Sequence, residues 1–152
     1  GAIGNAMEAL AEKNLIHTIH DAVNAGKPFL GICVGLQCLF DSSEENPGVQ
    51  GLSLIKGTVK RFGTELKVPH LGWNQVTQLE DSPLWKAIPD ESYFYFAHSF
   101  YVDPEEDVTI GQTDYHIDYT SAIHKDNIYG IQFHPEKSQK YGLTVLKNFV
   151  EL

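Results

Sequence analysis

The fold class is decided by residues 29–37, which read FLGICVGLQ. Residues 29–33 are apolar enough for a buried strand, and Gly35 permits a sharp turn into the apolar pattern of a second helix, which should end before residue 46. A cysteine between two glycines at such a junction has the form of a nucleophile elbow, in which neither glycine leaves room for a Cβ atom. Amides at the start of the helix would favour the thiolate. We therefore predict that Cys33 is a nucleophile; an inert, buried cysteine is the competing interpretation.

The rest of the chain alternates helical and strand-like patterns. Apolar residues recur at helical spacing over residues 4–24, and again from about residue 142 to the end. Residues 93–102 are aromatic and β-branched with almost no breakers, which predicts one long strand. Shorter strands are expected at 59–62, 73–76, 107–113, 119–124 and 128–133. This order predicts an α/β domain around a mixed sheet, with residues 1–152 forming a single domain.

Composition excludes several classes of function. The 152 residues carry 11 basic and 20 acidic side chains, a formal charge of −9, which argues against nucleic acid or an anionic membrane as the partner. No run of eighteen apolar residues indicates a membrane span. Two cysteines are too few for a disulfide scaffold and fit a reducing cytoplasm. We expect no metal and no cofactor.

A thiol nucleophile needs a base, and the base needs a group that fixes its tautomer. Of the seven histidines, only His134 is followed in fixed register by a carboxylate, in the stretch QFHPE at residues 132–136. Pro135 favours extended backbone, in which residues two apart point to the same side. We therefore predict that Glu136 orients His134, whose other ring nitrogen faces Cys33.

The remaining cysteine and histidines have weaker claims to a function. Cys38 should lie in the helix on another face, and we interpret it as structural. His17 and His20 are three residues apart but have no third ligand, so a solvated helix face is favoured over a metal site. His98 lies in the most apolar strand, either as a hydrogen-bonded core residue or as a pocket wall.

Together, GICVGLQ at residues 31–37 and QFHPEKS at residues 132–138 resemble the class I glutamine amidotransferases. The stretches PHLGWN at residues 69–74 and YFYFAHSF at residues 93–100 resemble, within that family, the glutaminase subunits of imidazole glycerol phosphate synthases of histidine biosynthesis. The resemblance covers essentially the whole chain. It implies a three-layer, flavodoxin-like fold, and hydrolysis of L-glutamine to glutamate and ammonia through a cysteine thioester.

The resemblance also assigns roles to individual residues. It implies a triad of Cys33, His134 and Glu136, and an oxyanion donor in the Val34 amide. Gln37, Ser99 and Phe100 would bind the substrate glutamine. Residues facing a partner would be Trp73, Tyr95 and Lys137. That partner would be a (β/α)₈ cyclase subunit, which takes the ammonia through a tunnel to make imidazole glycerol phosphate and AICAR in a cytoplasmic heterodimer.

The chain departs from the family pattern at its front. Family members begin with a strand, a helix and two more strands, which end in a Pro-Gly-Val-Gly segment that supplies a second oxyanion donor. Here only residues 1–2 match the end of that region, so we expect an N-terminally truncated domain. A catalytically silent docking module for the synthase partner is therefore one alternative function, and a γ-glutamyl hydrolase or another class I amidotransferase is a second.

Overall fold

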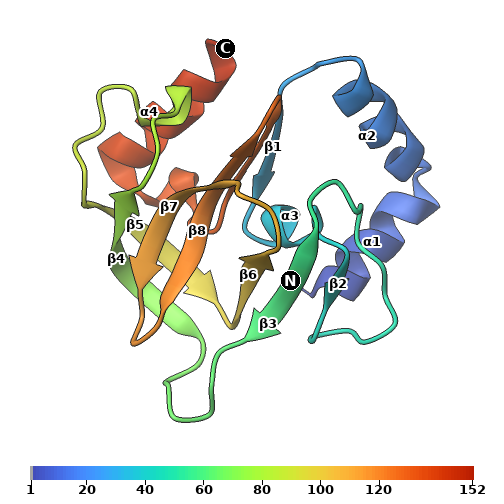
Figure 1. The fold of residues 1–152 in the computed structure, drawn as a ribbon, viewed down its shortest axis with the longest axis horizontal. Coiled ribbons are helices and arrows are strands. Elements are labelled where there is room, and N and C mark those ends of the chain that lie inside the picture. Colours follow the sequence, from blue (N-terminus) through green and yellow to red (C-terminus); the bar gives the residue numbers. More distant parts are fainter. Residues whose placement is uncertain (1) are drawn as a thin grey trace.

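A computed structural model of the protein describes residues 2–152 and has an α/β architecture (Figure 1). Its α-helices are α1 (Ile3–Glu12), α2 (Leu15–Asn24), α3 (Val34–Gln37) and α4 (Gln139–Val150). Two 3₁₀ turns are η1 (Pro83–Trp85) and η2 (Pro135–Lys137). The strands are β1 (Phe29–Ile32), β2 (Ser42–Ser43), β3 (Gly57–Arg61), β4 (His70–Gln78), β5 (Ser92–His98), β6 (Phe100–Pro104), β7 (Thr109–Asp114), β8 (Asp118–Lys125) and β9 (Ile128–Ile131).

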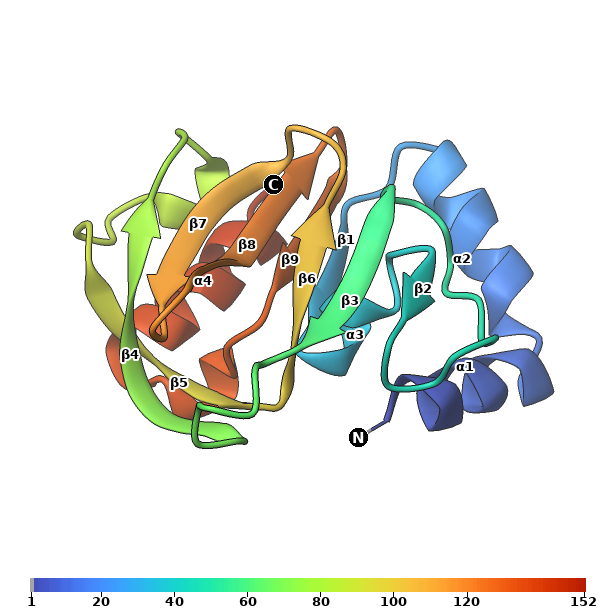
Figure 2. The same cartoon turned by 60° about the horizontal axis from the view of Figure 1, so that its bottom comes forward.

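The strands form one mixed sheet in the order β2-β3-β6-β8-β7-β4-β5. β9 pairs with β8 and β1, and the β1–β9 and β2–β3 pairs are parallel whereas the others are antiparallel. β4 joins the sheet only through Thr77 and Gln78, which pair with β7, and its first seven residues pair with β5. The β4–β5 ribbon therefore extends away from the main sheet, as Figure 2 shows. The predicted α/β fold with a mixed sheet is confirmed.

Helices cover both faces of the sheet, and a separate apolar core lies under each. Successive residues of β8 point to opposite faces: Ile123 packs in the core beneath α1, α2 and α3, and Ala122 packs in the core beneath α4. Ile128 and Tyr129 of β9 divide between the two cores in the same way. The result is the expected three-layer arrangement, which places the β1–α3 junction in the middle of the molecule (Figure 1).

Several predicted element boundaries are wrong. The single helix expected at 4–24 is two helices, because Asn14 adopts a left-handed backbone with φ of 54° and turns the chain. The strand expected at 93–102 is two strands, β5 and β6, interrupted at Ser99. The helix after Cys33 ends at Gln37, and strand β2 follows where more helix was expected. The C-terminal helix begins at Gln139, earlier than predicted.

Candidate functional site

Cys33 lies on a tight turn between β1 and α3. Its backbone has φ of 54° and ψ of −109°, an unfavourable conformation for a residue with a Cβ atom. The Cys33 N–H donates to the Ile131 carbonyl at 2.8 Å, which ties the turn to the end of β9. Strain of this kind is typical of a side chain held up out of a sheet for reaction.

The two glycines flanking Cys33 differ in their structural roles. A Cβ atom on Gly31 would lie 2.6 Å from the Gly35 carbonyl oxygen, so only glycine fits there. A Cβ atom on Gly35 would meet nothing within 4 Å. The interpretation that both glycines are required by close backbone approach is therefore wrong for Gly35.

A pocket of about 320 Å³ opens beside the cysteine. Six of its lining residues were already candidates from the sequence: Cys33, Val34, Gln37, His98, Ser99 and Phe100. The break between β5 and β6 at Ser99 lets these two strands wrap one side of the pocket. The proposed nucleophile, oxyanion donor and substrate-binding residues are thus brought together in one cavity.

Gln37 is buried, lines the pocket, and has its side-chain amide fixed by two hydrogen bonds. Its Nε2 donates to the Phe100 carbonyl at 3.1 Å and to Oε1 of Gln132 at 3.2 Å. Gln37 therefore links α3 to β6 and to the segment that follows β9, and it positions the Phe100 backbone against the pocket.

The Cys33 thiol accepts a hydrogen bond from Nε2 of Gln132 at an N···S distance of 3.6 Å, and the Val34 backbone N–H is a second donor group that acts on its pKa. Burial raises the pKa of the thiol, and these two donors lower it in part. The Glu136 carboxylate also raises it. The resting group is therefore a thiol, and reaction requires a base to remove its proton.

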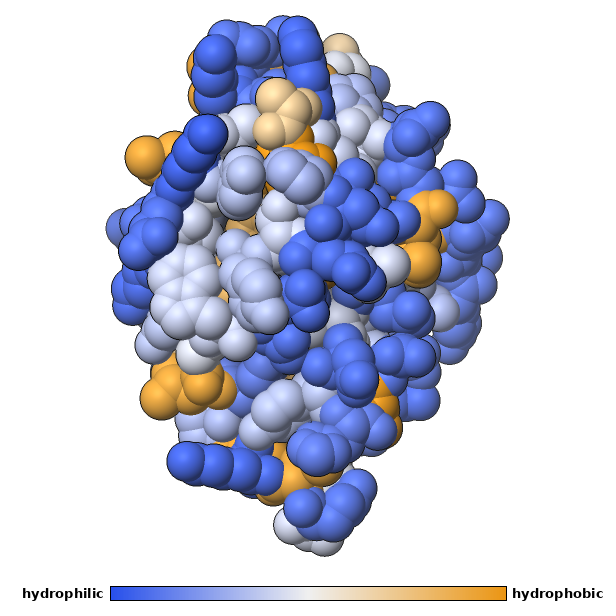
Figure 3. All heavy atoms as spheres, turned by 90° about the vertical axis from the view of Figure 1, so that its left-hand side faces the viewer, coloured by the Kyte–Doolittle hydropathy of each residue, from blue (hydrophilic) through white to orange (hydrophobic). Residues whose placement is uncertain are grey.

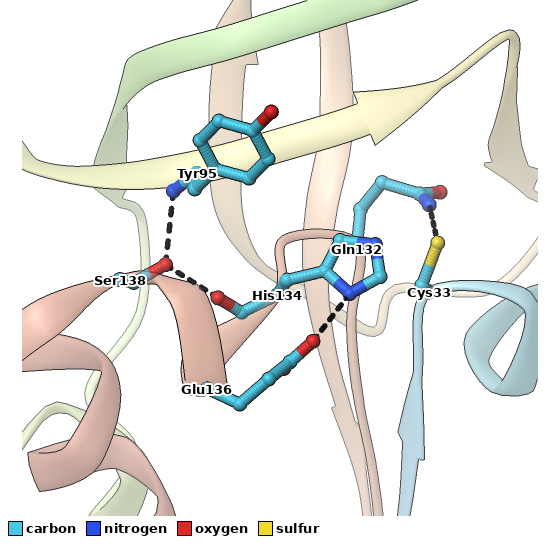
Figure 4. Close-up of polar contacts among 6 residues, drawn as sticks. All are labelled: Cys33, Tyr95, Gln132, His134, Glu136 and Ser138. Carbon is cyan, nitrogen blue, oxygen red and sulfur yellow. Dashed lines mark hydrogen bonds and ion pairs between the residues drawn. The ribbon is translucent and has the colours of Figure 1, made fainter.

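His134 and Glu136 form the expected pair. Nδ1 of His134 and Oε1 of Glu136 are 2.8 Å apart (Figure 4). The backbone route differs from the prediction, because Pro135 and Glu136 form the 3₁₀ turn η2 rather than extended chain. With Nδ1–H donating to the carboxylate, Nε2 of His134 keeps a free lone pair and can accept a proton.

His134 and Cys33 share no hydrogen bond in the described part of the chain, where each has a different partner. Figure 4 shows the imidazole between Glu136 and the cysteine. Catalytic hydrogen bonds are often long without substrate and shorten when it binds. The arrangement places a thiol at a pocket and, close to it, an imidazole hydrogen-bonded to a carboxylate, which are the groups that nucleophilic catalysis by a thiol requires.

His98 combines the two roles that the sequence left open, since it is buried and also lines the pocket. Its Nδ1–H donates to the Phe100 carbonyl at 2.7 Å. Its Nε2 lies 3.1 Å from Nδ1 of His70 and 3.1 Å from the Tyr119 hydroxyl. Burial lowers the pKa of His98 to about 3 and that of His70 to about 4, so both imidazoles are neutral. They support the pocket wall rather than take part in proton transfer.

Trp73, Tyr95 and Lys137 lie together on an outer face. Trp73 pairs with Tyr95 across the β4–β5 ribbon with ring centroids 6.0 Å apart, and Nζ of Lys137 lies 5.8 Å from the Tyr95 ring centroid. Leu71 and Tyr93 on the same face are 64% and 55% exposed. Figure 3 shows pale side chains of intermediate hydropathy gathered between hydrophilic ones on this side of the molecule. We call these five residues the ribbon face.

The ribbon face is joined directly to the loop that carries the base. The His134 N–H donates to the Tyr95 carbonyl at 2.9 Å. The Tyr95 N–H donates to Oγ of Ser138 at 2.9 Å (Figure 4). Ser138 in turn donates to the His134 carbonyl at 2.6 Å. The backbone of one ribbon residue therefore holds both ends of the His134 loop.

Sequence reasoning missed two residues of this site. Glu45 lines the pocket, and its half-buried carboxylate makes no hydrogen bond or ion pair within residues 2–152. It lies in an irregular loop with no motif around it. Gln132 stands in the QFHPE stretch but had no role assigned. Two signals in the sequence could have found them. Glu45 is an acidic residue soon after the predicted elbow, and Gln132 is a polar residue at the end of a buried strand.

Other candidate residues lie apart from the site. Cys38 is a buried, free thiol whose pKa burial raises to about 11. His17 pairs with Asp21 on an exposed helix face. Across residues 2–152 no group of three or more potential metal ligands comes together, and no helix there is long and apolar enough to cross a bilayer.

Comparison with known proteins identifies the fold as that of a class I glutamine amidotransferase. A family model described as glutamine amidotransferase class-I matches residues 3–152. PurLQS from Thermotoga maritima superposes with a TM-score of 0.71 at 18% identity, over 90% of this chain and 67% of that chain. A glutamine amidotransferase from the same organism gives a TM-score of 0.64 at 21% identity, over 92% of this chain and 52% of that chain.

Curated relatives are much more similar in sequence. Imidazole glycerol phosphate synthase subunit HisH of Methanocaldococcus jannaschii is 51% identical over 152 residues, which span 100% of this chain and 76% of that protein. HisH of Methanothermobacter thermautotrophicus is 53% identical, over 100% of this chain and 75% of that protein. The chain therefore belongs to the HisH family of the class I glutamine amidotransferases.

Proposed function

We propose that this protein hydrolyses L-glutamine to glutamate and ammonia through a thioester on Cys33. The observation that carries the proposal is the strained Cys33 turn at a pocket flanked by a hydrogen-bonded His134–Glu136 pair. The similarity to HisH subunits at about half identity supports the same activity. In this proposal residues 1–152 act as one amidotransferase domain.

The first half of the reaction forms the thioester. Nε2 of His134 takes the proton from Sγ of Cys33, and the thiolate attacks the side-chain carbonyl carbon of glutamine. The Val34 N–H stabilises the negative charge that develops on the carbonyl oxygen. His134 then returns the proton to the leaving nitrogen, the C–N bond breaks and ammonia departs.

The second half releases glutamate. His134 removes a proton from water, which attacks the thioester carbon, and the C–S bond breaks as the sulfur regains a proton. The Glu136 carboxylate holds Nδ1–H and stabilises the imidazolium that forms in each half-reaction.

The pocket supplies contacts for the rest of glutamine. Gln37, Ser99 and Phe100 bind the substrate in this scheme, and their positions around the cavity support the assignment. We add Glu45, whose unpaired carboxylate is suited to the α-ammonium group of an amino acid.

The ribbon face is the proposed docking site for the synthase partner, a (β/α)₈ cyclase subunit. Aromatic side chains that lie together on a surface, here Trp73 and Tyr95 with Lys137 beside them, are typical of the centre of a protein interface because Trp and Tyr are enriched there. The names of the HisH relatives support such a partner. The heterodimer would use the ammonia to make imidazole glycerol phosphate and AICAR in histidine biosynthesis, in the cytoplasm.

Glutamate release from glutamine, measured with and without the cyclase subunit, tests the proposal. We expect activity that the partner increases and that Cys33→Ala abolishes. Cys38→Ala is the matched control, since it removes a buried thiol five residues away and should retain activity. Unchanged turnover in Cys33→Ala would refute the mechanism.

Labelling by an electrophilic glutamine analogue separates the alternatives. An adduct on Cys33 in the presence of the partner is expected for the enzyme. No adduct, together with intact binding of the cyclase, would identify a silent docking module. Turnover of γ-glutamyl peptides in preference to glutamine would identify a γ-glutamyl hydrolase.

A further inference from the structure

Gln132 is the side chain that hydrogen-bonds the Cys33 thiol. It follows β9, is fully buried, and its Nε2 lies 3.6 Å from Sγ of Cys33 (Figure 4). Its backbone N–H donates to the Ser121 carbonyl at 2.9 Å, which anchors the residue to β8. The mechanism given above does not use this amide, although it contacts the reacting atom.

The orientation of the Gln132 amide follows from its neighbours. The Phe100 carbonyl can only accept hydrogen bonds, so Gln37 must present its NH₂ group to it. The same NH₂ group meets the Gln132 amide and must therefore face its oxygen, Oε1. Only the NH₂ group of Gln132 then remains for the sulfur. A backbone carbonyl thus sets the polarity of both glutamine side chains.

The Phe100 carbonyl is itself held in place from the other side. Nδ1–H of His98 donates to it at 2.7 Å, and His98 also contacts His70 and Tyr119. All buried side-chain nitrogen and oxygen atoms in the described residues have hydrogen-bond partners. In a fully satisfied buried network, an amide that turns over would leave at least two groups unpaired, which is costly.

We propose that Gln132 is a further catalytic residue, whose oriented amide donates a hydrogen bond that stabilises the Cys33 thiolate. This role rests on the proposed function. When the Sγ proton moves to Nε2 of His134, a negative charge appears on sulfur in a partly buried position. The Gln132 N–H is already directed at that charge and needs no rearrangement. No bond to Gln132 forms or breaks.

The electrostatic surroundings make such a donor useful. Burial and the Glu136 carboxylate both raise the pKa of Cys33. Glu45 across the pocket adds a further carboxylate, and His98 is neutral. His134 becomes a cationic partner once it is protonated. The Val34 N–H and the Gln132 amide both lower the pKa of Cys33 and so favour the thiolate.

The test is the pH dependence of Cys33 alkylation by iodoacetamide, measured by peptide mass spectrometry on the full chain without glutamine or partner. Gln132→Met keeps the size of the side chain and removes the donor. We expect it to raise the pH midpoint of alkylation by about one unit, corresponding to about tenfold slower reaction below the midpoint. Cys38 serves as an internal check of folding, because this buried thiol should stay unlabelled in every sample.

Gln132→Glu provides a second variant of nearly the same shape. It replaces the donor by a carboxylate, so we expect a midpoint at least as high as that of Gln132→Met. A merely space-filling role for Gln132 predicts that Gln132→Met alkylates with the wild-type midpoint, and that result would overturn the proposal.

A measurement on the wild-type protein decides the question even where the variants do not fold. The side-chain amide protons of Gln132, followed by ¹⁵N NMR, should shift with the midpoint at which Cys33 titrates. Amide signals that do not respond to that titration contradict the hydrogen bond.

The two proposals fail in different ways. A Gln132→Met protein that loses glutaminase activity at an unchanged alkylation midpoint refutes this inference and leaves the Cys33 mechanism standing. A shifted midpoint in a protein whose Cys33→Ala variant still hydrolyses glutamine refutes the mechanism instead.

Discussion

Glu136 has one polar partner, the His134 imidazole, and its side chain is half exposed. Its function in the proposed mechanism is electrostatic as well as geometric, because it holds Nδ1–H and stabilises the imidazolium. Glu136→Gln keeps the shape and removes the charge. We expect kcat for glutamine hydrolysis to fall by roughly 10²-fold with KM little changed.

The control for that variant is Glu151→Gln, which removes an exposed carboxylate from a weak pair with Lys147 in the last turn of the chain. Steady-state glutamate release should be the same as wild type in this protein. An equal loss in both variants would show that the effect of Glu136→Gln is not specific to the site.

Glu45 should act on binding rather than on chemistry. Its carboxylate faces the pocket without a partner, so Glu45→Gln removes a charge that would meet the α-ammonium of glutamine. We expect KM to rise by about tenfold with a small effect on kcat. Glu80→Gln, on a distant exposed loop, is the control, and kinetics against glutamine concentration separates the two parameters. A fall in kcat at constant KM would contradict the binding role.

Among single residues, sequence reasoning found those with a motif and missed those without one. Cys33 and His134 stand in stretches whose spacing suggests chemistry, and the structure places Cys33 at the pocket and His134 beside Glu136. Glu45 reaches the pocket only because the chain turns after β2, a contact that no local pattern specifies. Gln132 is identified by its hydrogen bonds to Gln37 and Cys33, which lie 95 and 99 positions earlier.

At the scale of elements, Gly31 and Gly35 of the β1–α3 turn differ in the space that each leaves for a Cβ atom. Gly31→Ala forces a Cβ atom against the Gly35 backbone, and we expect a loss of roughly 1–3 kcal/mol in the free energy of unfolding. Gly35→Ala lies in a helix with open space around it and should be neutral or stabilising by about 0.5–1 kcal/mol. Urea unfolding of the two variants measures both effects, and similar destabilisation by each would contradict the geometry.

Element types were more predictable than element ends. Helical spacing over residues 4–24 was real, but one left-handed residue, Asn14, divides it into α1 and α2. The aromatic run at 93–102 has strand character throughout, yet the chain leaves the ribbon at Ser99 and enters the main sheet as β6. In both places tertiary packing sets the break, and neither propensity nor periodicity records it.

At the scale of the molecule, the buried histidines make stability depend on pH. Burial lowers the pKa of His70 to about 4 and of His98 to about 3, both below the ordinary value of 6.5. Between pH 6.5 and about 4 the unfolded chain therefore binds more protons than the folded one. Stability falls as the pH falls through this window, by up to about 1.4 kcal/mol per pH unit for each histidine.

Denaturant unfolding at pH 7, 6, 5 and 4.5 checks this dependence. His98→Asn should reduce the slope, whereas His116→Asn, which removes an exposed histidine, should leave it unchanged. Equal slopes in all three proteins would show that His98 does not titrate on unfolding.

The ribbon face should dominate association with the cyclase. Trp73→Ala removes its central aromatic side chain, and we expect the Kd to rise by about thirtyfold or more. Leu79→Ala is matched to it, because Leu79 is also 46% exposed and lies just beyond the end of β4. Titration calorimetry with the purified cyclase compares the two, and equal affinities would place the interface elsewhere.

The hydrogen bond from the His134 N–H to the Tyr95 carbonyl has a consequence for hydrogen exchange. The proton on that amide can be replaced by deuterium only when the ribbon and the His134 loop separate. Its exchange rate therefore reports how often the hydrogen bond between the His134 loop and β5 opens in the free protein, without any substrate. A protein that docks on the ribbon and stiffens β5 will slow exchange of this one amide, and the slower exchange will report its effect on the loop that carries the base.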